Sequence, residues 1–271
     1  MTLSIEELEA RRAALEAELG EPITVDGLTA TFRIFQRKKG HRHSTDDLLT
    51  AWYALEKSPP VTRALDLGTG IGTVGLLVLA GMPEGMRLTC IEAQDVSYRF
   101  LRENLRANDV EARVDALHGD LRELALDQRL PLVTGSPPYF DVAAGIVPAD
   151  SQKAHARFEL RGDVSDYASA ARRHLESDGL FVLCFPWPQK ARALAALHGE
   201  GFAVAHRDVI PRTGLAPLFS LFACTLAPAG APAPDVEEPP FVVRHEDGSH
   251  TQAMHDVRAR FGWPPSNEGS R

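Results

Sequence analysis

A glycine-rich turn is the first feature of the chain with a recognisable chemical use. The segment ALDLGTGIGTVGL, residues 64–76, follows a short apolar run with Gly68, Gly70 and Gly72. Glycines at the turn from a strand to a helix let the backbone approach a ligand, and the helix N-terminus attracts the ligand's polar groups. The dinucleotide pattern G-x-G-x-x-G needs a glycine where this chain has Thr73. The alternatives are an ordinary strand–helix turn and a nicotinamide site.

A strand that ends in this way resembles motif I of the S-adenosylmethionine-dependent methyltransferases. The resemblance implies that the glycine turn, Thr69 included, faces the amino-acid end of the cofactor S-adenosyl-L-methionine. It also implies that Asp66, on the strand before the turn, shapes that pocket.

Two acidic residues follow the next two apolar runs. Glu92 ends the run RLTCIE, and its two carboxylate oxygens match the two hydroxyls of a ribose. The methyltransferase resemblance implies that Asp120 lies beside the adenine amino group, with Leu121 and Ala93 packed on the ring. A solvated strand-end charge is the alternative for Glu92, and a helix cap is the alternative for Asp120.

The sequence SPPYF, residues 136–140, follows the apolar run LPLVTG and resembles the N/D/S-P-P-Y/F motif of methyltransferases that act on planar nitrogens. Two acceptors, the Ser136 side chain and a carbonyl of Pro137 or Pro138, would hold the hydrogens of such a nitrogen. Tyr139 would stack on the flat substrate, and the adjacent Phe140 is a candidate substrate contact. This chemistry needs positioning and electrostatics but neither a metal nor a covalent nucleophile. The alternative is a proline-rich turn with a buried tyrosine.

Alternating strands and helices must position these residues. Strands are expected at 29–35, 64–68, 87–92, 112–120, 130–135, 179–186, 202–210 and 218–226, and helices at 4–19, 44–57, 72–80, 96–108, 164–177 and 188–201. Alternation of this kind predicts an α/β fold with a parallel sheet whose ligands lie at the carboxyl ends of the strands. We expect a Rossmann-like, mostly parallel sheet of seven strands with an antiparallel final strand pair and an N-terminal helical and strand extension.

The segment before the glycine turn narrows the family. FRIFQRKKGHRHSTDDLLTAW, residues 32–52, resembles the entry segment of the bacterial tRNA(Val) adenine-N6 methyltransferases, with Gln36, Gly40, Asp46 and a leucine pair in the matching positions. The resemblance covers about residues 28–226 and, more loosely, 240–262. It implies N-methylation of a planar exocyclic amine, most directly adenine N6 in tRNA.

Ser136 departs from the Asn or Asp that this motif mostly carries and is the variant familiar among cytosine-N4 DNA methyltransferases. Four alternatives therefore stay open. They are methylation of cytosine N4, of a protein glutamine or of a small molecule, and a cofactor-binding module without turnover.

A dense basic cluster precedes the glycine turn, in a chain whose formal net charge is −8. Arg37, Lys38 and Arg42 belong to it, and Arg157 lies in the long segment after SPPYF. These side chains could hold RNA phosphates, or they could form an ordinary solvated surface.

Composition sets the remaining limits. Three cysteines in 271 residues cannot form a disulfide framework, so we expect reduced core thiols and a cytoplasmic protein. The histidines lack metal-ligand spacing and no apolar run is long enough to span a membrane, so neither a metal nor a membrane is expected. The expected units are an N-terminal cap and substrate-entry segment (1–57), the methyltransferase domain (58–226), a Pro/Ala-rich linker (227–240) and a strand–helix appendage (241–271).

Overall fold

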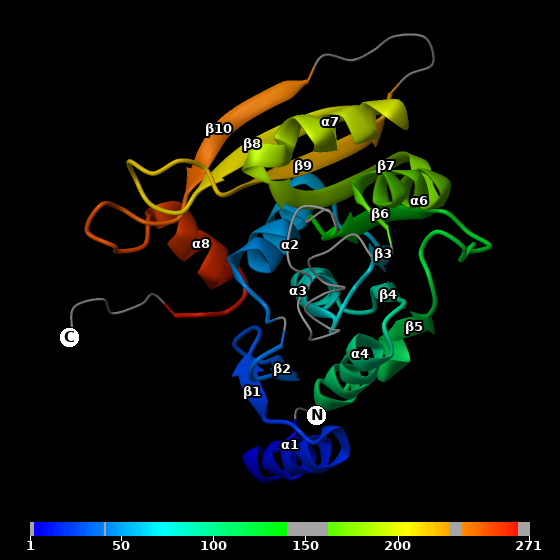
Figure 1. Cartoon of the computed structure of the whole chain (residues 1–271), viewed down its shortest axis with the longest axis vertical. Helices are drawn as coiled ribbons and strands as arrows, with labels where there is room; N and C mark the ends of the chain where they lie inside the picture. Colours follow the sequence, from blue (N-terminus) through cyan, green and yellow to red (C-terminus); the bar gives the residue numbers. More distant parts are fainter. Residues whose placement is uncertain (1–2, 41, 140–161, 228–234, 265–271) are drawn as a thin grey trace.

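The computed structural model describes residues 3–40, 42–139, 162–227 and 235–264. Its helices and strands follow the order of the chain in Figure 1. They are α1 (Ile5–Leu19), β1 (Ile23–Gly27), β2 (Arg33–Arg37), α2 (Thr45–Lys57), β3 (Arg63–Leu67), α3 (Thr73–Gly81), β4 (Arg87–Glu92), α4 (Asp95–Ala107), η1 (Glu111–Arg113), β5 (Val114–His118), β6 (Leu130–Gly135), α6 (Val164–His174), β7 (Leu175–Pro186), η3 (Trp187–Gln189), α7 (Lys190–Gly199), β8 (Phe202–Ile210), β9 (Phe219–Leu226), β10 (Val236–Val242) and α8 (Gln252–Arg260).

The central sheet confirms the predicted α/β class. Its strand order is β10-β8-β9-β7-β6-β3-β4-β5, and β9 runs antiparallel to both β7 and β8 while the other neighbouring pairs are parallel. Helices α2 and α3 pack on one face and α6 and α7 on the other. The three cysteines are free and buried, as expected.

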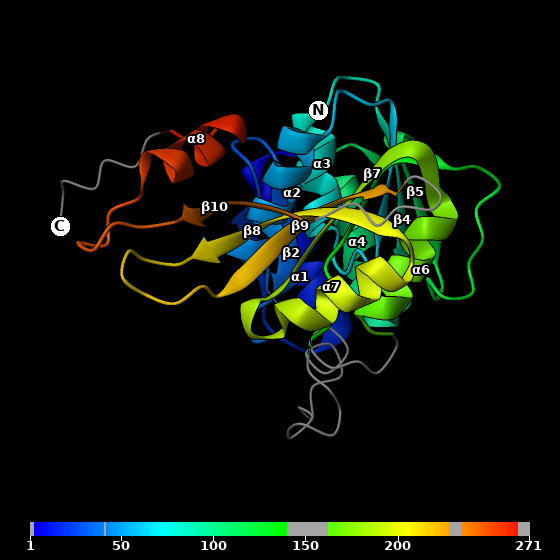
Figure 2. The same cartoon turned by 90° about the horizontal axis from the view of Figure 1, so that it is seen from above.

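The expected strand number was wrong, because the central sheet has eight strands, rather than seven, within the described residues. The additional strand, β10, pairs parallel with β8 and begins at Val236, inside the Pro/Ala-rich stretch. Pro239 and Pro240 interrupt its register between Glu238 and Phe241. Proline has no N–H to donate, so it is tolerated at an edge strand such as this one. Figure 2 shows β10 lying beside β8, with α8 beyond it.

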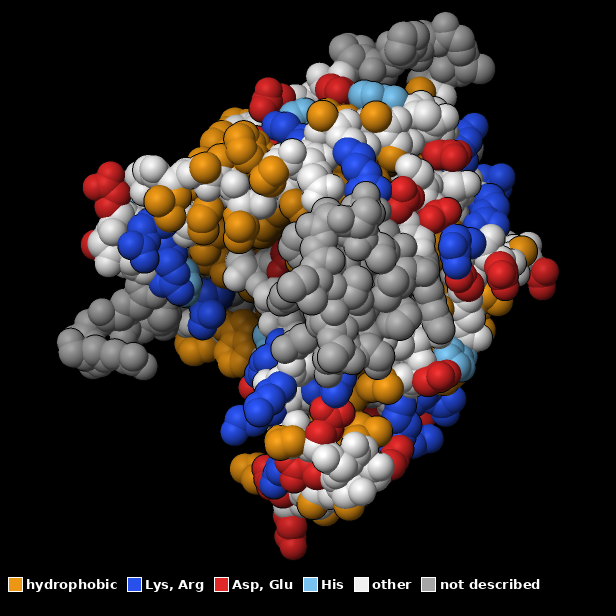
Figure 3. Space-filling model, in the orientation of Figure 1, with side chains coloured by type: hydrophobic (Ala, Val, Ile, Leu, Met, Phe, Trp, Pro, Cys, Tyr) orange, Lys and Arg blue, Asp and Glu red, His pale blue; other side chains and the backbone are white. Residues whose placement is uncertain are grey.

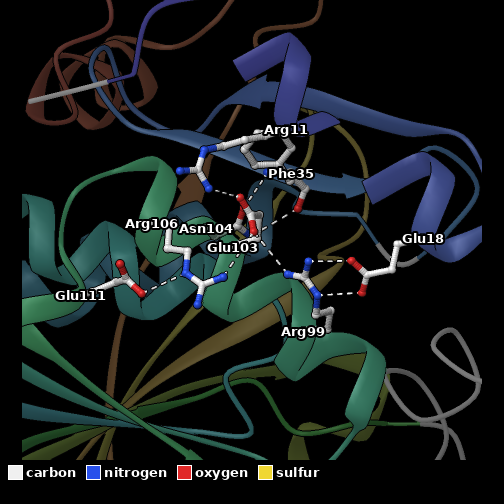
Figure 4. Close-up of polar contacts among 8 residues, drawn as sticks. All are labelled: Arg11, Glu18, Phe35, Arg99, Glu103, Asn104, Arg106 and Glu111. Atoms are coloured by element: carbon white, nitrogen blue, oxygen red, sulfur yellow. Dashed lines mark hydrogen bonds and ion pairs between the residues drawn. The ribbon is translucent and has the colours of Figure 1, made fainter. Parts of the chain in front are cut away.

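The N-terminal segment packs on α4 through amides and charges (Figure 4). Asn104 accepts a hydrogen bond from the Phe35 backbone N–H at 2.7 Å and donates to the Phe35 and Ile71 carbonyls. Glu103, whose side chain is only 6% exposed, forms ion pairs with Arg11, Arg99 and Arg106. The β1–β2 hairpin lies outside the central sheet, and side chains of α4 therefore provide hydrogen-bond partners for backbone groups of β2.

The pairing of β3 with β4 and β6 brings the predicted motifs to the same edge of the central sheet. Leu67 at the end of β3 pairs with Ile91 of β4 and with Gly135 of β6. The residues that come next, Gly68, Glu92 and Ser136, therefore leave the sheet side by side at its carboxyl edge. This is the edge at which open α/β sheets bind ligands.

Candidate cofactor and substrate site

One cavity opens at the carboxyl ends of β3, β4, β5 and β6. Most of the sequence-predicted cofactor and motif residues line it: Asp66, Gly68, Thr69, Gly70, Glu92, Ala93, Asp120, Leu121, Ser136 and Pro138. Gly72, Pro137 and Tyr139 belong to the same turns but are not part of its lining. The separate motifs therefore converge on one space.

The glycine turn needs its glycines for two reasons. Gly68, Gly70 and Gly72 have φ values of 57°, 60° and 96°, in the left-handed region that other residues rarely adopt. At Gly68 a Cβ atom would also lie 1.8 Å from the hydroxyl of Tyr167, a buried residue of α6. The turn is thus packed directly beneath a tyrosine from the opposite side of the sheet.

Asp66 fixes the turn from below. Its carboxylate accepts hydrogen bonds from the Thr69 hydroxyl, from the Thr134 hydroxyl at 2.7 Å and from the Gly75 backbone N–H at 3.0 Å. Burial raises the pKa of Asp66, and these three donors oppose that rise. The carboxylate joins β3, β6 and the first turn of α3, which gives it a structural reason to be buried.

Glu92 is held by backbone donors. One carboxylate oxygen accepts from the Gly70 N–H at 2.8 Å, and the other accepts from the Gln94 N–H at 2.7 Å. Burial raises the pKa of Glu92, while the two N–H groups lower it. Because each carboxylate oxygen can accept a second hydrogen bond, both remain able to receive hydroxyl donors from a ligand.

Asp120 has a partner from its own turn. Its carboxylate accepts from the backbone N–H and the guanidinium of Arg122, at 2.7 to 3.0 Å. The Asp120 carbonyl also accepts from the Glu123 and Leu124 N–H groups, so the residue stabilises a turn while it lines the cavity. The capping interpretation and the ligand interpretation of Asp120 are therefore compatible.

The SPPY segment forms one wall of the cavity. Ser136 Oγ lies 3.7 Å from the Cys184 Sγ of β7, and burial raises the pKa of that thiol to about 12. Tyr139 meets Phe185 edge to face, with ring centroids 6.5 Å apart, and its carbonyl accepts from the Gln189 side chain at 2.7 Å. Phe140 lies outside the described residues.

Of the predicted basic residues, the three that the structure describes, Arg37, Lys38 and Arg42, do not line the cavity. Arg37 pairs with Glu21 at 2.6 Å, Arg42 pairs with Asp26 at 3.0 Å, and Lys38 is exposed. On the face drawn in Figure 3, basic side chains lie over the β1–β2 hairpin and near α8, with acidic side chains among them. Arg157 lies outside the described residues.

Asp47 and Tyr167 are among the lining residues that the sequence patterns did not indicate. Asp47 lies in the first turn of α2, and Tyr167 lies on α6, far along the chain from the glycine turn. Asp47 had a sequence signal, since a Ser followed three residues later by an acid is typical of a capping box at a helix start. Nothing local to Tyr167 indicates that it reaches the cavity.

The cavity is acidic. Asp47, Asp66, Glu92 and Asp120 line it, and no Lys, Arg or His is among its described lining residues. Such a lining attracts a positively charged ligand. Across the described residues, no group of three or more His, Cys, Asp or Glu could hold a metal ion. No helix in the described parts of the chain has the length and apolar character needed to cross a membrane.

The model of the methyltransferase small domain matches residues 47–194 of this chain. A tRNA1(Val) (adenine(37)-N6)-methyltransferase of Histophilus somni is 26% identical over 189 residues, 69% of this chain and 77% of that protein. The enzyme of the same name from Pasteurella multocida is 27% identical over 206 residues, 73% of this chain and 84% of that protein. A solved Agrobacterium tumefaciens structure, described as a predicted O-methyltransferase, shares the fold with a TM-score of 0.63 at 22% identity, covering 82% of this chain and 100% of that chain.

The Rossmann-like sheet and the acidic cavity at its carboxyl edge, within the matched residues, define an S-adenosylmethionine-dependent methyltransferase. The chain belongs to the methyltransferase small domain family.

The residues present fit the cofactor of this class, S-adenosyl-L-methionine. Its sulfonium and ammonium groups give it the positive charge that a cavity lined by carboxylates requires. Its ribose diol matches the acceptor capacity left on Glu92, and its adenine ring matches the apolar side chains of Ala93 and Leu121 in the same lining. When bound, the cofactor supplies an electrophilic methyl group on its sulfonium sulfur.

Proposed function

We propose that this methyltransferase methylates a planar exocyclic amine and that its substrate is adenine N6 in tRNA. One observation carries the proposal: Ser136 and Pro138 line the same cavity as Asp66, Gly68 and Glu92. An amine held by the SPPY wall would therefore lie next to the cofactor. The two relatives named above are called tRNA1(Val) (adenine(37)-N6)-methyltransferases, and this chain matches them over 77% and 84% of their length. Their names support the choice of substrate.

The proposed roles follow the cavity from one end to the other. Gly68, Thr69, Gly70 and Gly72, with Asp66 below them, hold the methionine end of the cofactor. Glu92 binds the ribose, Asp120 receives the adenine amino group, and Ala93 and Leu121 pack on the ring. Arg37, Lys38, Arg42 and Arg157 contact the RNA backbone, and Phe140 contacts the substrate.

The SPPY residues act on the nitrogen. In a planar amine the nitrogen lone pair is delocalised, so the nitrogen is a weak nucleophile. Ser136 Oγ and the Pro137 carbonyl accept hydrogen bonds from its two N–H groups and hold the nitrogen in a pyramidal geometry, while Tyr139 stacks on the ring that carries it. With the cofactor bound, the nitrogen would form a bond to the methyl carbon while the carbon–sulfur bond breaks and its electron pair stays on the sulfur, which becomes a neutral thioether. The methylated nitrogen would then lose one proton to water. Pro138, buried beside Tyr139, fixes the direction of the turn.

We also propose the units that serve these roles. Residues 1–57 form the cap and substrate-entry segment, 58–226 the methyltransferase domain and 241–271 the C-terminal appendage. The stretch 227–240 connects the last two, and its final residues contribute to β10.

The test is transfer of labelled methyl groups into separate pools of undermodified tRNA, DNA and protein, followed by nucleoside analysis. We expect label in tRNA as N6-methyladenosine. Label in DNA as N4-methylcytosine, or label confined to protein or small molecules, would overturn the substrate. No label in any pool despite cofactor binding would indicate a module without turnover.

A pair of variants tests the SPPY wall. Tyr139→Ala should lose most methyl transfer, because base stacking contributes about 1–3 kcal/mol. Cofactor affinity should stay nearly unchanged, and Tyr139→Phe, which keeps the ring, should retain most transfer. Equal turnover in the Ala variant and the wild type would remove Tyr139 from the site.

A further inference from the structure

The least satisfied acid of the cavity is Asp47, which the roles above do not use. It lies in the first turn of α2, is 5% exposed and lines the cavity together with Asp66 and Ser136. One of its oxygens, Oδ2, accepts the Ser44 backbone N–H at 3.0 Å as part of a capping box. Among the described residues no other donor contacts its carboxylate. A buried carboxylate with spare acceptor capacity therefore faces the ligand space.

The other three acids differ from Asp47 in this respect. Asp66 has three donors, Glu92 has two backbone N–H groups, and Asp120 has the Arg122 guanidinium. A buried ionised carboxylate needs a cation or several donors to balance its loss of hydration. Asp47 has one N–H and no cation within the described structure, so its balance must come from a ligand.

The position of Asp47 identifies the end of the cavity that it serves. Asp47 lies on α2, which packs on α3, the helix that follows the glycine turn, and against β6 and β7. Glu92 and Asp120 follow β4 and β5, on the other side of β3. Cofactor bound with its ribose at Glu92 would extend its amino-acid end toward Asp47.

We propose that Asp47 binds the α-ammonium group of the cofactor's methionine portion. An ammonium group has three N–H donors, and a carboxylate partner makes such hydrogen bonds shorter and stronger than neutral ones. The pairing neutralises the one cavity acid that lacks adequate partners. The proposal rests on the cavity being the cofactor site and does not depend on which amine is methylated.

The test is a double-mutant cycle between protein and ligand, measured by titration calorimetry on the full chain. The probes are S-adenosylhomocysteine and its deaminated analogue, which keeps the carboxylate but lacks the ammonium. For Asp47→Asn we expect the dissociation constant of S-adenosylhomocysteine to rise about tenfold or more, the range for a hydrogen bond to a charged group. The dissociation constant of the deaminated analogue should change by less than about twofold.

Two controls separate this role from a structural one. Asp47→Asn keeps an oxygen that can accept the Ser44 N–H, so a thermal melt close to that of the wild type would show an intact helix start. Asp46→Asn removes the adjacent acid and should leave both dissociation constants unchanged. Equal weakening of both probes in Asp47→Asn, or no weakening of either, would overturn the proposal.

The outcomes also separate this inference from the proposed function. Binding needs no methyl acceptor, so failure to methylate tRNA would leave the cycle interpretable. If the wild-type chain bound neither probe, the cofactor site itself would be misplaced and the role of Asp47 would fall with it.

Discussion

Two buried groups of charges in this molecule are built in opposite ways. On α4, the Glu103 carboxylate is surrounded by Arg11, Arg99 and Arg106, so its charge is balanced within the protein. In the cavity, Asp47, Asp66 and Glu92 are buried, as Glu103 is, yet no basic side chain joins them among the described lining residues. The first arrangement holds the N-terminal segment in place, and the second leaves charge to be balanced by a ligand.

The contrast indicates how to distinguish structural acids from ligand-binding acids. A structural acid finds its cations in the folded chain, and its removal is felt in folding. An acid at a cationic ligand's site carries its desolvation cost until the ligand arrives, and its removal is felt in binding. The predictions below test this separation, from the largest expected effect to the smallest.

Glu103→Ala should lower the free energy of unfolding by about 3 kcal/mol, the lower end for breaking a buried ion pair, because its three arginines are partly exposed. Cofactor affinity should not change. Denaturant unfolding and titration calorimetry measure the two quantities. Glu18→Ala, which removes an exposed partner of Arg99, is the control and should cost less than about 1 kcal/mol. A Glu103 variant as stable as the wild type would break the comparison.

Glu92→Ala should show the reverse pattern. We expect cofactor binding to weaken by about 1.5–3 kcal/mol, the range for hydrogen bonds to a charged group. Asp115→Ala, an exposed acid on the neighbouring strand β5, serves as the matched control and should leave the dissociation constant unaltered. An unchanged constant for Glu92→Ala would remove this residue from the ribose site.

Stability and cofactor affinity measured as a function of pH should reveal the unbalanced cavity acids without any mutation. Burial raises the pKa values of Asp47, Asp66 and Glu92. An acid of this kind contributes stability that is fully present below its unfolded pKa and is lost as the pH rises through its folded pKa. Lowering the pH from 7 should therefore stabilise the ligand-free protein through these groups, by at most about 1.4 kcal/mol per group and pH unit. Cofactor affinity should fall over the same interval.

Thermal melts of the wild type and of Asp47→Asn across this pH range isolate the contribution of Asp47 to stability. Acids with lowered pKa values, such as Asp26 and Asp208, act in the opposite direction and are common to both proteins. The Asn variant should be more stable than the wild type at high pH, with the difference shrinking as the pH falls. A difference that is constant with pH, or a cofactor affinity that does not vary with pH, would contradict the assignment of unbalanced charge to the cavity.

Arg42→Ala should give the smallest effect on folding. Its ion pair with Asp26 is more than one-third exposed on each side, so its loss should cost less than about 1 kcal/mol. If Arg42 contacts an RNA phosphate, the salt dependence of tRNA binding should decrease by about one counterion. An unaltered salt slope would identify Arg42 as a hairpin residue with a structural role.

Local patterns were sufficient for most of the fold and for the core of the site. The runs ending at Leu67, Glu92 and Gly135 are strands that end at one level, so the glycine turn, the acid and the SPPY segment meet as expected. This succeeded because parallel strands share one carboxyl edge, and the residue type at each strand end then indicates its chemistry.

Contacts between distant segments were not predictable in the same way. Tyr167 reaches Gly68 from α6, and no spacing within either segment encodes that approach. Asp47 has the sequence pattern of a helix start, and that pattern alone does not show that its side chain also lines the cavity. A strand was expected only from residue 241, in an appendage, because Pro239 and Pro240 exclude a central strand. Only the sheet as a whole reveals that β10 begins at Val236 and lies at the edge of the central sheet.

That proline pair has a consequence for how the protein behaves in concentrated solution. An outer strand normally offers a row of N–H and C=O groups on which a second molecule can add its own strand. Pro239 and Pro240 are exposed, lack N–H groups and shift the register of β10. At the opposite edge, β5 is only five residues long and carries the exposed Asp115. Both ends of the sheet are thereby poor templates for strand addition, which protects the chain against edge-to-edge aggregation.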